Sequence, residues 1–228
     1  MIFGFIALAV LAYLLGSIPT GYLIMRWARG VDIRKVGTGK IGAANVLRSG
    51  SKKLAIPVFL FDILKGVLPV LVARFTGMDP WQWVVVGLLA IIGHNWPLYL
   101  KFKGGGRGIA VSAGVITALS WQLGIFVFIF PYLFAPIKQV ALGVFIALLA
   151  FPILSGFLPG LYTDGQRWPI TIGLAGITVL ALTRRLIAHR SELSKGVPWQ
   201  EILINRLLFD RDIGDRRIWN TGAAKKSK

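Results

Sequence analysis

The sequence alternates between long apolar segments and short polar segments that contain glycine. A helix needs about 20 apolar residues to cross the hydrocarbon core of a bilayer, and most of the apolar segments approach that length. They lie near residues 2–25, 54–75, 81–100, 108–120, 122–135, 138–157 and 168–189. This pattern predicts an all-α integral membrane protein with about seven transmembrane helices.

The fourth and fifth apolar segments, 108–120 and 122–135, are short for membrane spans. They form either two short helices or one long broken helix. We predict a turn at Trp121–Gly124, and Pro131 and Pro136 disturb the chain that follows, because proline removes a helical hydrogen bond. We prefer seven spans to six because an odd number separates the charged segments more cleanly.

Positive charge is concentrated in alternate connecting segments. With the N-terminus outside, the internal segments hold 23 of the 26 Lys and Arg residues; they are 26–53, 101–107, 135–138 and 184–228. Cytoplasmic loops of membrane proteins carry such an excess. We therefore predict an external N-terminus, with both glycine-rich loops and the C-terminus in the cytoplasm. The same bias accounts for the net charge of +17, so we expect no nucleic-acid partner.

The composition restricts the chemistry that the chain can perform. Apolar residues make up 55% of the chain and charged residues 15%, which excludes an ordinary soluble domain. The sequence has no cysteine, which excludes a disulfide framework and thiolate chemistry. Two histidines, His94 and His189, are too few for a dedicated zinc site, and we expect no metal.

The chain divides into one transmembrane domain, residues 1–190, and a basic cytoplasmic tail, residues 191–228. Within the tail, residues 197–209 have the pattern of an amphipathic helix, with Pro198 near its start. Such a helix can lie in the membrane interface. We therefore predict an interfacial helix in the tail.

The polar segment after the first span combines glycines with cations and small polar side chains. Glycines let the backbone turn tightly and present N–H groups to an anion, while cations supply countercharge. Glycine spacing alone is weak evidence, and the alternative is a solvated loop that only sets the topology. The candidate residues are Arg34, Gly37, Thr38, Gly39, Lys40, Gly42, Asn45 and Arg48.

The polar segment after the third span has the same character and leads into another apolar segment. Backbone N–H groups in such a loop and at the following helix start favour phosphate. A flexible connector is the alternative. His94 either makes an ordinary interfacial hydrogen bond or handles a proton or phosphate. The candidate residues are His94, Lys103, Gly104, Gly105, Arg107 and Gly108.

Two charged residues lie inside the second apolar segment. Asp62 and Lys65 share one helical face, and charges at membrane depth are usually paired or functional. We favour a structural ion pair, although Arg34 or Arg48 could also reach Asp62. His189, at the end of the last span, is either an interfacial anchor or a functional group.

Together these motifs resemble the bacterial acyl-phosphate:glycerol-3-phosphate acyltransferases, a seven-span membrane family. The similarity runs from about Tyr13 to His189. The family pattern G-S/T-G-N-x-G-A-T-N-x-x-R corresponds to residues 37–48, and the stretches 16–23, 62–66 and 93–97 also match. The order and spacing of several motifs make this resemblance more specific than any one glycine run.

The resemblance implies transfer of an acyl group from acyl phosphate to the 1-hydroxyl of glycerol 3-phosphate, giving lysophosphatidic acid and phosphate. It implies an enzyme of phospholipid biosynthesis in the bacterial cytoplasmic (inner) membrane, with no bound cofactor; we expect a monomer. Thr38, Asn45, Arg107 and His189 would act in catalysis, and one phosphate group could accept the hydroxyl proton. The substrate phosphates would be bound by Arg34, Gly37, Gly39, Lys40, Gly42, Arg48, His94, Lys103, Gly104, Gly105 and Gly108.

The sequence departs from the family pattern at several positions. Lys40 replaces Asn, Ala44 and Val111 replace Thr, Arg107 replaces Lys after one extra glycine, and Glu192 replaces an amide. Lys40 could pair with Glu192 and preserve the net charge. These departures keep one alternative open, a paralogue with another acceptor or a non-catalytic lipid-phosphate-binding role. The intramembrane charges of Asp62 and Lys65 permit a second, a small transporter, which we disfavour because the sequence shows no inverted repeat.

Overall fold

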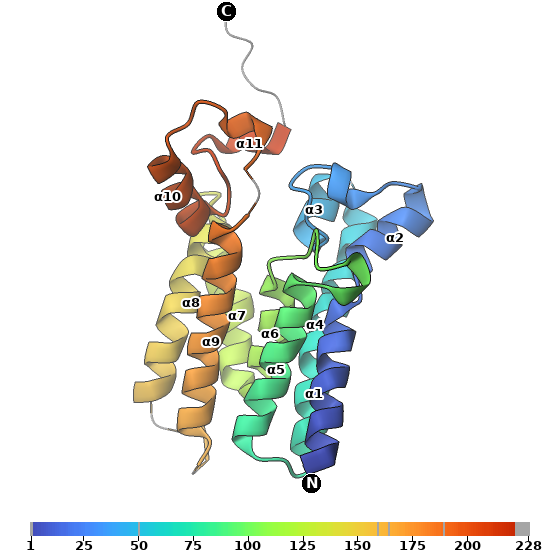
Figure 1. The fold of residues 1–228 in the computed structure, drawn as a ribbon. Coiled ribbons are helices and arrows are strands. Elements are labelled where there is room, and N and C mark those ends of the chain that lie inside the picture. The colour runs from blue at the N-terminus through green and yellow to red at the C-terminus, as the bar shows by residue number, and fades with distance from the viewer. Residues whose placement is uncertain (1, 50, 159, 164, 189, 222–228) are drawn as a thin grey trace, which may run out of the picture.

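The computed structural model describes residues 2–49, 51–158, 160–163, 165–188 and 190–221, and this part of the chain is helical (Figure 1). The α-helices are α1 (Ile2–Ser17), α2 (Thr20–Arg29), α3 (Ala43–Arg48), α4 (Lys52–Phe75), α5 (Pro80–Asn95), α6 (Ile109–Leu119), α7 (Trp121–Ile129), α8 (Val140–Phe157), α9 (Arg167–Leu186), α10 (Trp199–Phe209) and α11 (Arg216–Thr221). Short 3₁₀ turns are η1 (Ile33–Lys35), η2 (Leu98–Leu100), η3 (Phe130–Phe134) and η4 (Glu192–Ser194).

Five helical segments in this described part are long and apolar enough to cross a membrane: Ile2–Arg29, Lys52–Phe75, Pro80–Leu100, Val140–Phe157 and Arg167–Leu186. Two shorter apolar helical segments, Ile109–Leu119 and Trp121–Phe134, lie between them. The predicted all-helical membrane fold is therefore confirmed. Seven complete crossings and their sidedness stay predictions.

The predicted turn at Trp121–Gly124 is wrong, because α7 begins at Trp121. The break lies one residue earlier, at Ser120, whose backbone is extended (φ −151°, ψ 113°). The Ser120 hydroxyl accepts a hydrogen bond from the Leu123 backbone N–H, 3.5 Å away, as expected of a residue that caps a helix start. The fourth and fifth apolar segments are thus two separate helices.

Glycines allow the central helices to approach each other closely. A Cβ added at Gly66 of α4 would lie 2.1 Å from the Val111 carbonyl oxygen of α6, and one added at Gly114 of α6 would lie 2.2 Å from the Ile63 carbonyl oxygen of α4. Small residues at helix contacts are a common means of packing in membranes, where apolar burial alone does not drive association. Gly66 and Gly114 therefore fix α4 against α6.

We expect Gly66→Ala to destabilise the fold by about 1–3 kcal/mol, because the methyl group overpacks a tight helix contact. The measurement is the thermal unfolding midpoint of the purified protein in detergent. Gly4→Ala is the matched control, because a Cβ at Gly4 would meet no atom within 4 Å. Equal midpoints for the two variants would contradict this account of the α4–α6 contact.

The ion pair predicted inside the second apolar segment is confirmed. Lys65 Nζ lies 2.9 Å from Asp62 Oδ1, and the two residues expose only 3% and 1% of their surface. Thr20 donates to the same Asp62 oxygen over 2.6 Å, and Lys65 also donates to the Ile18 carbonyl, which lies at the break between α1 and α2. The pair thus joins α4 to the break between α1 and α2, where the Ile18 carbonyl also accepts a hydrogen bond from the Thr20 backbone N–H over 3.0 Å.

The segments that carry the candidate chemistry gather at one end of the helix bundle. Figure 1 shows α2, α3, the connection from α5 to α6 and the α10–α11 region at the end opposite the N-terminus. The predicted helix in 197–209 is present as α10, which buries Ile202, Asn205 and Arg206. Its position at a membrane surface and a domain boundary at residue 190 stay predictions.

Candidate active site

A cavity of about 970 Å³ opens at this end of the bundle, between three stretches that are distant in sequence. Seven Lys or Arg residues and two Asp residues line it, so that the cavity is strongly cationic. The lining residues are Asp32, Arg34, Lys35, Val36, Gly37, Thr38, Gly39, Lys40, Arg48, Lys103, Gly104, Arg107, Ala188, Arg190, Ser191, Leu193, Asp212 and Trp219.

Asn45 holds the first glycine-rich loop in shape from beneath. Its Oδ1 accepts a hydrogen bond from the Thr38 backbone N–H over 2.8 Å, and its Nδ2 donates to the carbonyls of Ile33, Val36 and Lys40 over 2.9–3.1 Å. The residue is 2% exposed and does not line the cavity. Its amide is therefore engaged in ordering the loop backbone.

The contact between Asn45 and the loop leaves no room for a side chain at residue 37. Its φ of +57° lies in the left-handed region, and a Cβ there would be 2.4 Å from Asn45 Oδ1. Only glycine meets both demands without strain. The loop can therefore close around the Asn45 amide, while Thr38, the next residue, lines the cavity.

Arg34 is fixed by two neighbours. Its guanidinium donates to both carboxylate oxygens of Asp32 over 2.7–3.2 Å and lies 4.8 Å from the centre of the Tyr22 ring. The hydrogen bond from Arg34 outweighs burial and lowers the pKa of Asp32 to about 2. The alternative in which Arg34 reaches Asp62 is not realised, because Arg34 pairs with Asp32 and Asp62 pairs with Lys65.

The second glycine-rich loop touches the first loop. A Cβ at Gly104 (φ +70°) would lie 2.9 Å from Arg34 Cδ, so the two loops meet at this pair. Lys103, Gly104 and Arg107 line the cavity together with the first loop. A site that draws on both loops is thus geometrically available.

The remaining glycines of the second loop face the protein rather than the cavity. A Cβ at Gly106 would lie 1.9 Å from His94 Nε2, and one at Gly105 would lie 2.1 Å from the Asn95 carbonyl oxygen. Arg184, near the end of α9, donates to the carbonyls of Gly105 and Gly106 over 3.1–3.4 Å. These glycines let the loop pack tightly between α5 and α9.

Arg107 is held by the C-terminal segment. Its guanidinium donates to the Asp210 carboxylate at the end of α10, and Arg185 Nε lies 3.8 Å from the other Asp210 oxygen. The Arg107 Nε has no hydrogen-bond partner among the described residues. Asp210 therefore fixes the position of Arg107 and leaves donor capacity for an anion.

A second carboxylate, Asp212, binds the segment that follows α9. It accepts from the Arg206 Nε over 2.7 Å and from the Ser191 backbone N–H over 2.6 Å. Burial raises its pKa, but the hydrogen bonds from Arg206 and Ser191 lower it more, so that the carboxylate stays charged. The C-terminal segment thus forms one wall of the cavity.

Comparison with known proteins identifies the family. The protein-family model described as glycerol-3-phosphate acyltransferase matches residues 6–197. The chain belongs to this family.

Full-length relatives support the assignment. The chain is 41% identical to "Glycerol-3-phosphate acyltransferase 4" of Dehalococcoides mccartyi strain CBDB1, over 97% of each chain. It is 40% identical to "Glycerol-3-phosphate acyltransferase 5" of another strain of that species, over 98% of this chain and 97% of the relative. The acyltransferase resemblance seen in the motifs is confirmed.

Solved structures of PlsY, an integral membrane glycerol 3-phosphate acyltransferase, have the same fold. The glycerol 3-phosphate form is 33% identical, with a TM-score of 0.71 over 84% of this chain and 98% of that chain. The lysophosphatidic acid form is 30% identical, with a TM-score of 0.72 over 96% of this chain and 100% of that chain.

The family motifs divide into cavity-lining and supporting residues. Of the predicted site residues, those that line the cavity are Arg34, Gly37, Thr38, Gly39, Lys40, Arg48, Lys103, Gly104 and Arg107. Those that are described but do not line it are Gly42, Asn45, His94, Gly105 and Gly108.

His189 lies outside the described residues, but its neighbours Ala188 and Arg190 line the cavity. The side chain of Glu192 is also outside the description, so its pairing with Lys40 stays a prediction. Among the family departures, Lys40 and Arg107 line the cavity, whereas Val111 is fully buried in α6.

Sequence reasoning missed the carboxylates of the acyltransferase's C-terminal segment. Asp210 and Asp212 lie after residue 197, where the match to the family model ends, and no family motif points to them. The available signal was local: two of the chain's nine acidic residues flank Arg211 in a tail that holds more basic than acidic residues. Such carboxylates are candidates for pairing with cations elsewhere in the fold.

Proposed function

We propose that the chain transfers an acyl group from acyl phosphate to the 1-hydroxyl of glycerol 3-phosphate, giving lysophosphatidic acid and inorganic phosphate. The observation that carries the proposal is the cavity of about 970 Å³ in which two loops from distant parts of a glycerol-3-phosphate acyltransferase place cations around one space. Both substrates bear phosphate, and both would be attracted to such a space.

The reaction needs orientation and anion stabilisation more than a strong nucleophile, because acyl phosphate is an activated donor. The acceptor hydroxyl oxygen bonds to the acyl carbon, and the bond between that carbon and the phosphate oxygen breaks. The leaving phosphate keeps the bonding electron pair and takes the hydroxyl proton. Lys103 and Arg107 stabilise the phosphate charge, and the Thr38 hydroxyl binds a phosphate oxygen or the acceptor.

We assign Asn45 a positioning role in place of direct catalysis, because its amide is hydrogen-bonded to four backbone groups of the loop. His189 is proposed to orient a substrate or share a proton, supported by the place of its neighbours in the cavity wall. The cavity is proposed to face the bacterial cytoplasm. This is supported by the positive-inside rule, because 23 of the 26 Lys and Arg residues lie in the connecting segments predicted to be internal. The acyl chain would enter sideways from the bilayer.

The direct test is an assay of purified protein in lipid nanodiscs with acyl phosphate and glycerol 3-phosphate. We expect coupled formation of lysophosphatidic acid, detected by mass spectrometry, and inorganic phosphate. A panel of other phosphorylated acceptors serves as the specificity control. Phosphate release only with another acceptor would favour the divergent paralogue, and no release with any acceptor would favour a binding role.

The departure at Lys40 gives a pH prediction. Burial, together with the charges of Arg184 and Arg107, lowers the pKa of Lys40 to about 8. The lysine is therefore charged at pH 7 and loses its proton as the pH rises through about 8, while the substrate phosphate remains a dianion above about pH 6. We expect KM for glycerol 3-phosphate to rise about tenfold between pH 7 and 9.

The matched variant is Lys40→Asn, which carries the residue usual in the family and has no group that titrates near pH 8. Its KM should stay nearly constant over the same range. Initial rates at saturating acyl phosphate, measured at half-unit pH steps, give the comparison. The same rise in KM for both proteins would show that Lys40 does not contribute the charge.

A further inference from the structure

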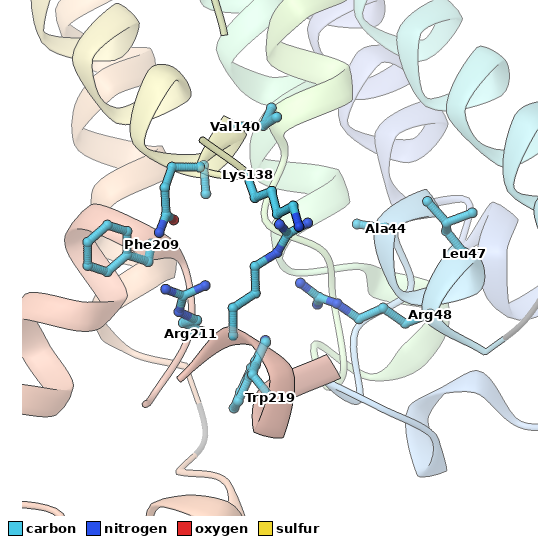
Figure 2. A pocket seen from close by; sticks show the side chains of 11 residues that line it. Ala44, Leu47, Arg48, Lys138, Val140, Phe209, Arg211 and Trp219 are labelled. Atoms are coloured by element: carbon cyan, nitrogen blue, oxygen red, sulfur yellow. The ribbon is translucent and has the colours of Figure 1, made fainter. Parts of the chain in front are cut away.

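A second cavity adjoins the candidate active site. It has a volume of about 450 Å³ and is bounded by α3, by residues 138–141 at the start of α8, and by the C-terminal segment. Arg48 and Trp219 line both cavities. Figure 2 shows its lining residues, which are Ala44, Leu47, Arg48, Lys138, Gln139, Val140, Ala141, Phe209, Arg211, Arg216 and Trp219.

The lining of this second cavity is cationic. Its lining contains four cations, Arg48, Lys138, Arg211 and Arg216, and no carboxylate. Figure 2 shows the side chains of Arg48, from α3, and Lys138, just before α8, extending toward the same space, with Arg211 to one side near Phe209. Like charges gathered in this way repel one another, so an anion in the cavity would stabilise the arrangement.

Arg211 gives independent support for a ligand. It exposes only 6% of its surface, and its Nε has no hydrogen-bond partner in the described part of the chain. Among these residues its guanidinium forms no salt bridge: Asp215 acts on it only at longer range, and the Phe209 ring lies 4.8 Å from the guanidinium carbon. Burying an unpaired guanidinium is costly, and an anion in the cavity would supply the missing partner.

The cations that line the two cavities differ in their hydrogen-bond partners. In the candidate active site, Arg34, Arg107 and Arg190 are each tied by hydrogen bonds to Asp32, to Asp210 and to backbone carbonyls, respectively. In the second cavity, Arg48, Lys138 and Arg216 form no salt bridge with a carboxylate of the described residues, and Asp210 acts on Arg48 only at longer range. Their donors remain available to a ligand.

We propose that this second cavity binds a phosphate-bearing anion in addition to the two substrates. The anion is either free inorganic phosphate or the phosphate headgroup of a lipid, because both present the same oxygens to Lys and Arg donors. Leu47, Val140 and Phe209 also give the cavity apolar walls, which suit the glycerol and first methylene groups of a lipid. This site does not depend on the acyl transfer proposed above.

The C-terminal segment completes this site. Phe209, Arg211, Arg216 and Trp219 all lie beyond residue 197, where the match to the family model ends. The family motifs alone therefore do not specify this second site.

The test is equilibrium binding to the purified full-length chain in uncharged detergent, with glycerol 3-phosphate at saturation to occupy the active site. One experiment titrates radiolabelled inorganic phosphate and measures the bound label. The other titrates lysophosphatidic acid or phosphatidylglycerol and measures the bound lipid by native mass spectrometry. The variant Lys138→Gln/Arg216→Gln removes two exposed cations of the cavity. We expect it to bind the anion at least about tenfold more weakly.

The control is Lys52→Gln/Lys53→Gln, which removes two exposed charges at the start of α4, away from both cavities. It should bind like the parent. Arg211→Gln, checked for an unchanged unfolding midpoint, should weaken binding further.

Weakening in the phosphate experiment identifies free phosphate, and weakening in the lipid experiment identifies a headgroup; either result supports the site. Equal binding by parent and variants in both experiments, or no binding by the parent in either experiment, overturns it. A failure of acyl transfer would be seen separately, because these measurements involve no turnover.

Discussion

Arg107→Ala should raise KM for a phosphate substrate by about 10- to 100-fold. The reason is that Arg107 is a cavity-lining cation with a free Nε donor, and one charge-assisted hydrogen bond contributes about 1.5–3 kcal/mol. The measurement is steady-state kinetics with each substrate varied in turn at saturation of the other. The substrate whose KM rises is the one whose phosphate Arg107 binds.

Lys101→Ala is the control for this prediction. Lys101 belongs to the same connection between α5 and α6, but it is exposed and lines neither cavity. Its removal changes the net charge as Arg107→Ala does, so any general electrostatic effect appears in both variants. If KM were unchanged in Arg107→Ala, or rose equally in Lys101→Ala, Arg107 would be a topology charge without a binding role.

The unfolding midpoint separates binding from folding in this comparison. Arg107 also holds Asp210, so its loss removes one attachment of the C-terminal segment. Asp210 keeps Arg185 within 3.8 Å, and Asp212 keeps its own bonds to Arg206 and Ser191. The segment therefore stays attached at several points, and we expect a small shift of the midpoint beside a large change in KM.

Features set by local spacing were predictable from the sequence. The pair Asp62–Lys65 follows from two charges three residues apart inside an apolar helix. The meeting of the two glycine-rich loops, seen at Gly104 and Arg34, follows from placing both loops on one side of a membrane. In each case a general physical constraint leaves few arrangements.

Features set by distant partners were not predictable in this way. The attachment of Arg107 to Asp210 joins residues 103 positions apart, and neither residue carries a signal that names the other. The glycines at 105, 106 and 108 illustrate the same limit. Their composition suggested a phosphate cradle, whereas the packing of Gly106 against His94 depends on the crossing of α5 with the loop.

For Asn45, the sequence predicted that the residue belongs to the site but did not predict its role. The family resemblance implies a catalytic role for this side chain, which lies in α3 directly after the glycine-rich loop. The structure uses it to bind four backbone groups from beneath the loop. The difference rests on which way one amide points, and spacing along the chain does not encode that direction.

Asn45→Ala should therefore reduce kcat/KM by at least about 100-fold without removing any group that touches a substrate. The change leaves the Thr38 N–H and three carbonyls without their buried partner, at a cost of about 1 kcal/mol for each hydrogen bond. The loop then loses its fixed shape, and a displacement of about 1 Å at a reacting site can cost about 100-fold in rate.

Hydrogen exchange distinguishes this positioning role from direct catalysis. In Asn45→Ala we expect faster exchange of the amides between Val36 and Lys40, together with the loss of kcat/KM. Asn205→Ala is the matched control: it removes another buried amide, 6% exposed, whose Nδ2 has no hydrogen-bond partner among the residues that the structure describes, and it should change neither quantity. A catalytic loss in Asn45→Ala with unchanged exchange in the loop would mean that the amide acts on the substrates themselves, and the positioning role would have to be abandoned.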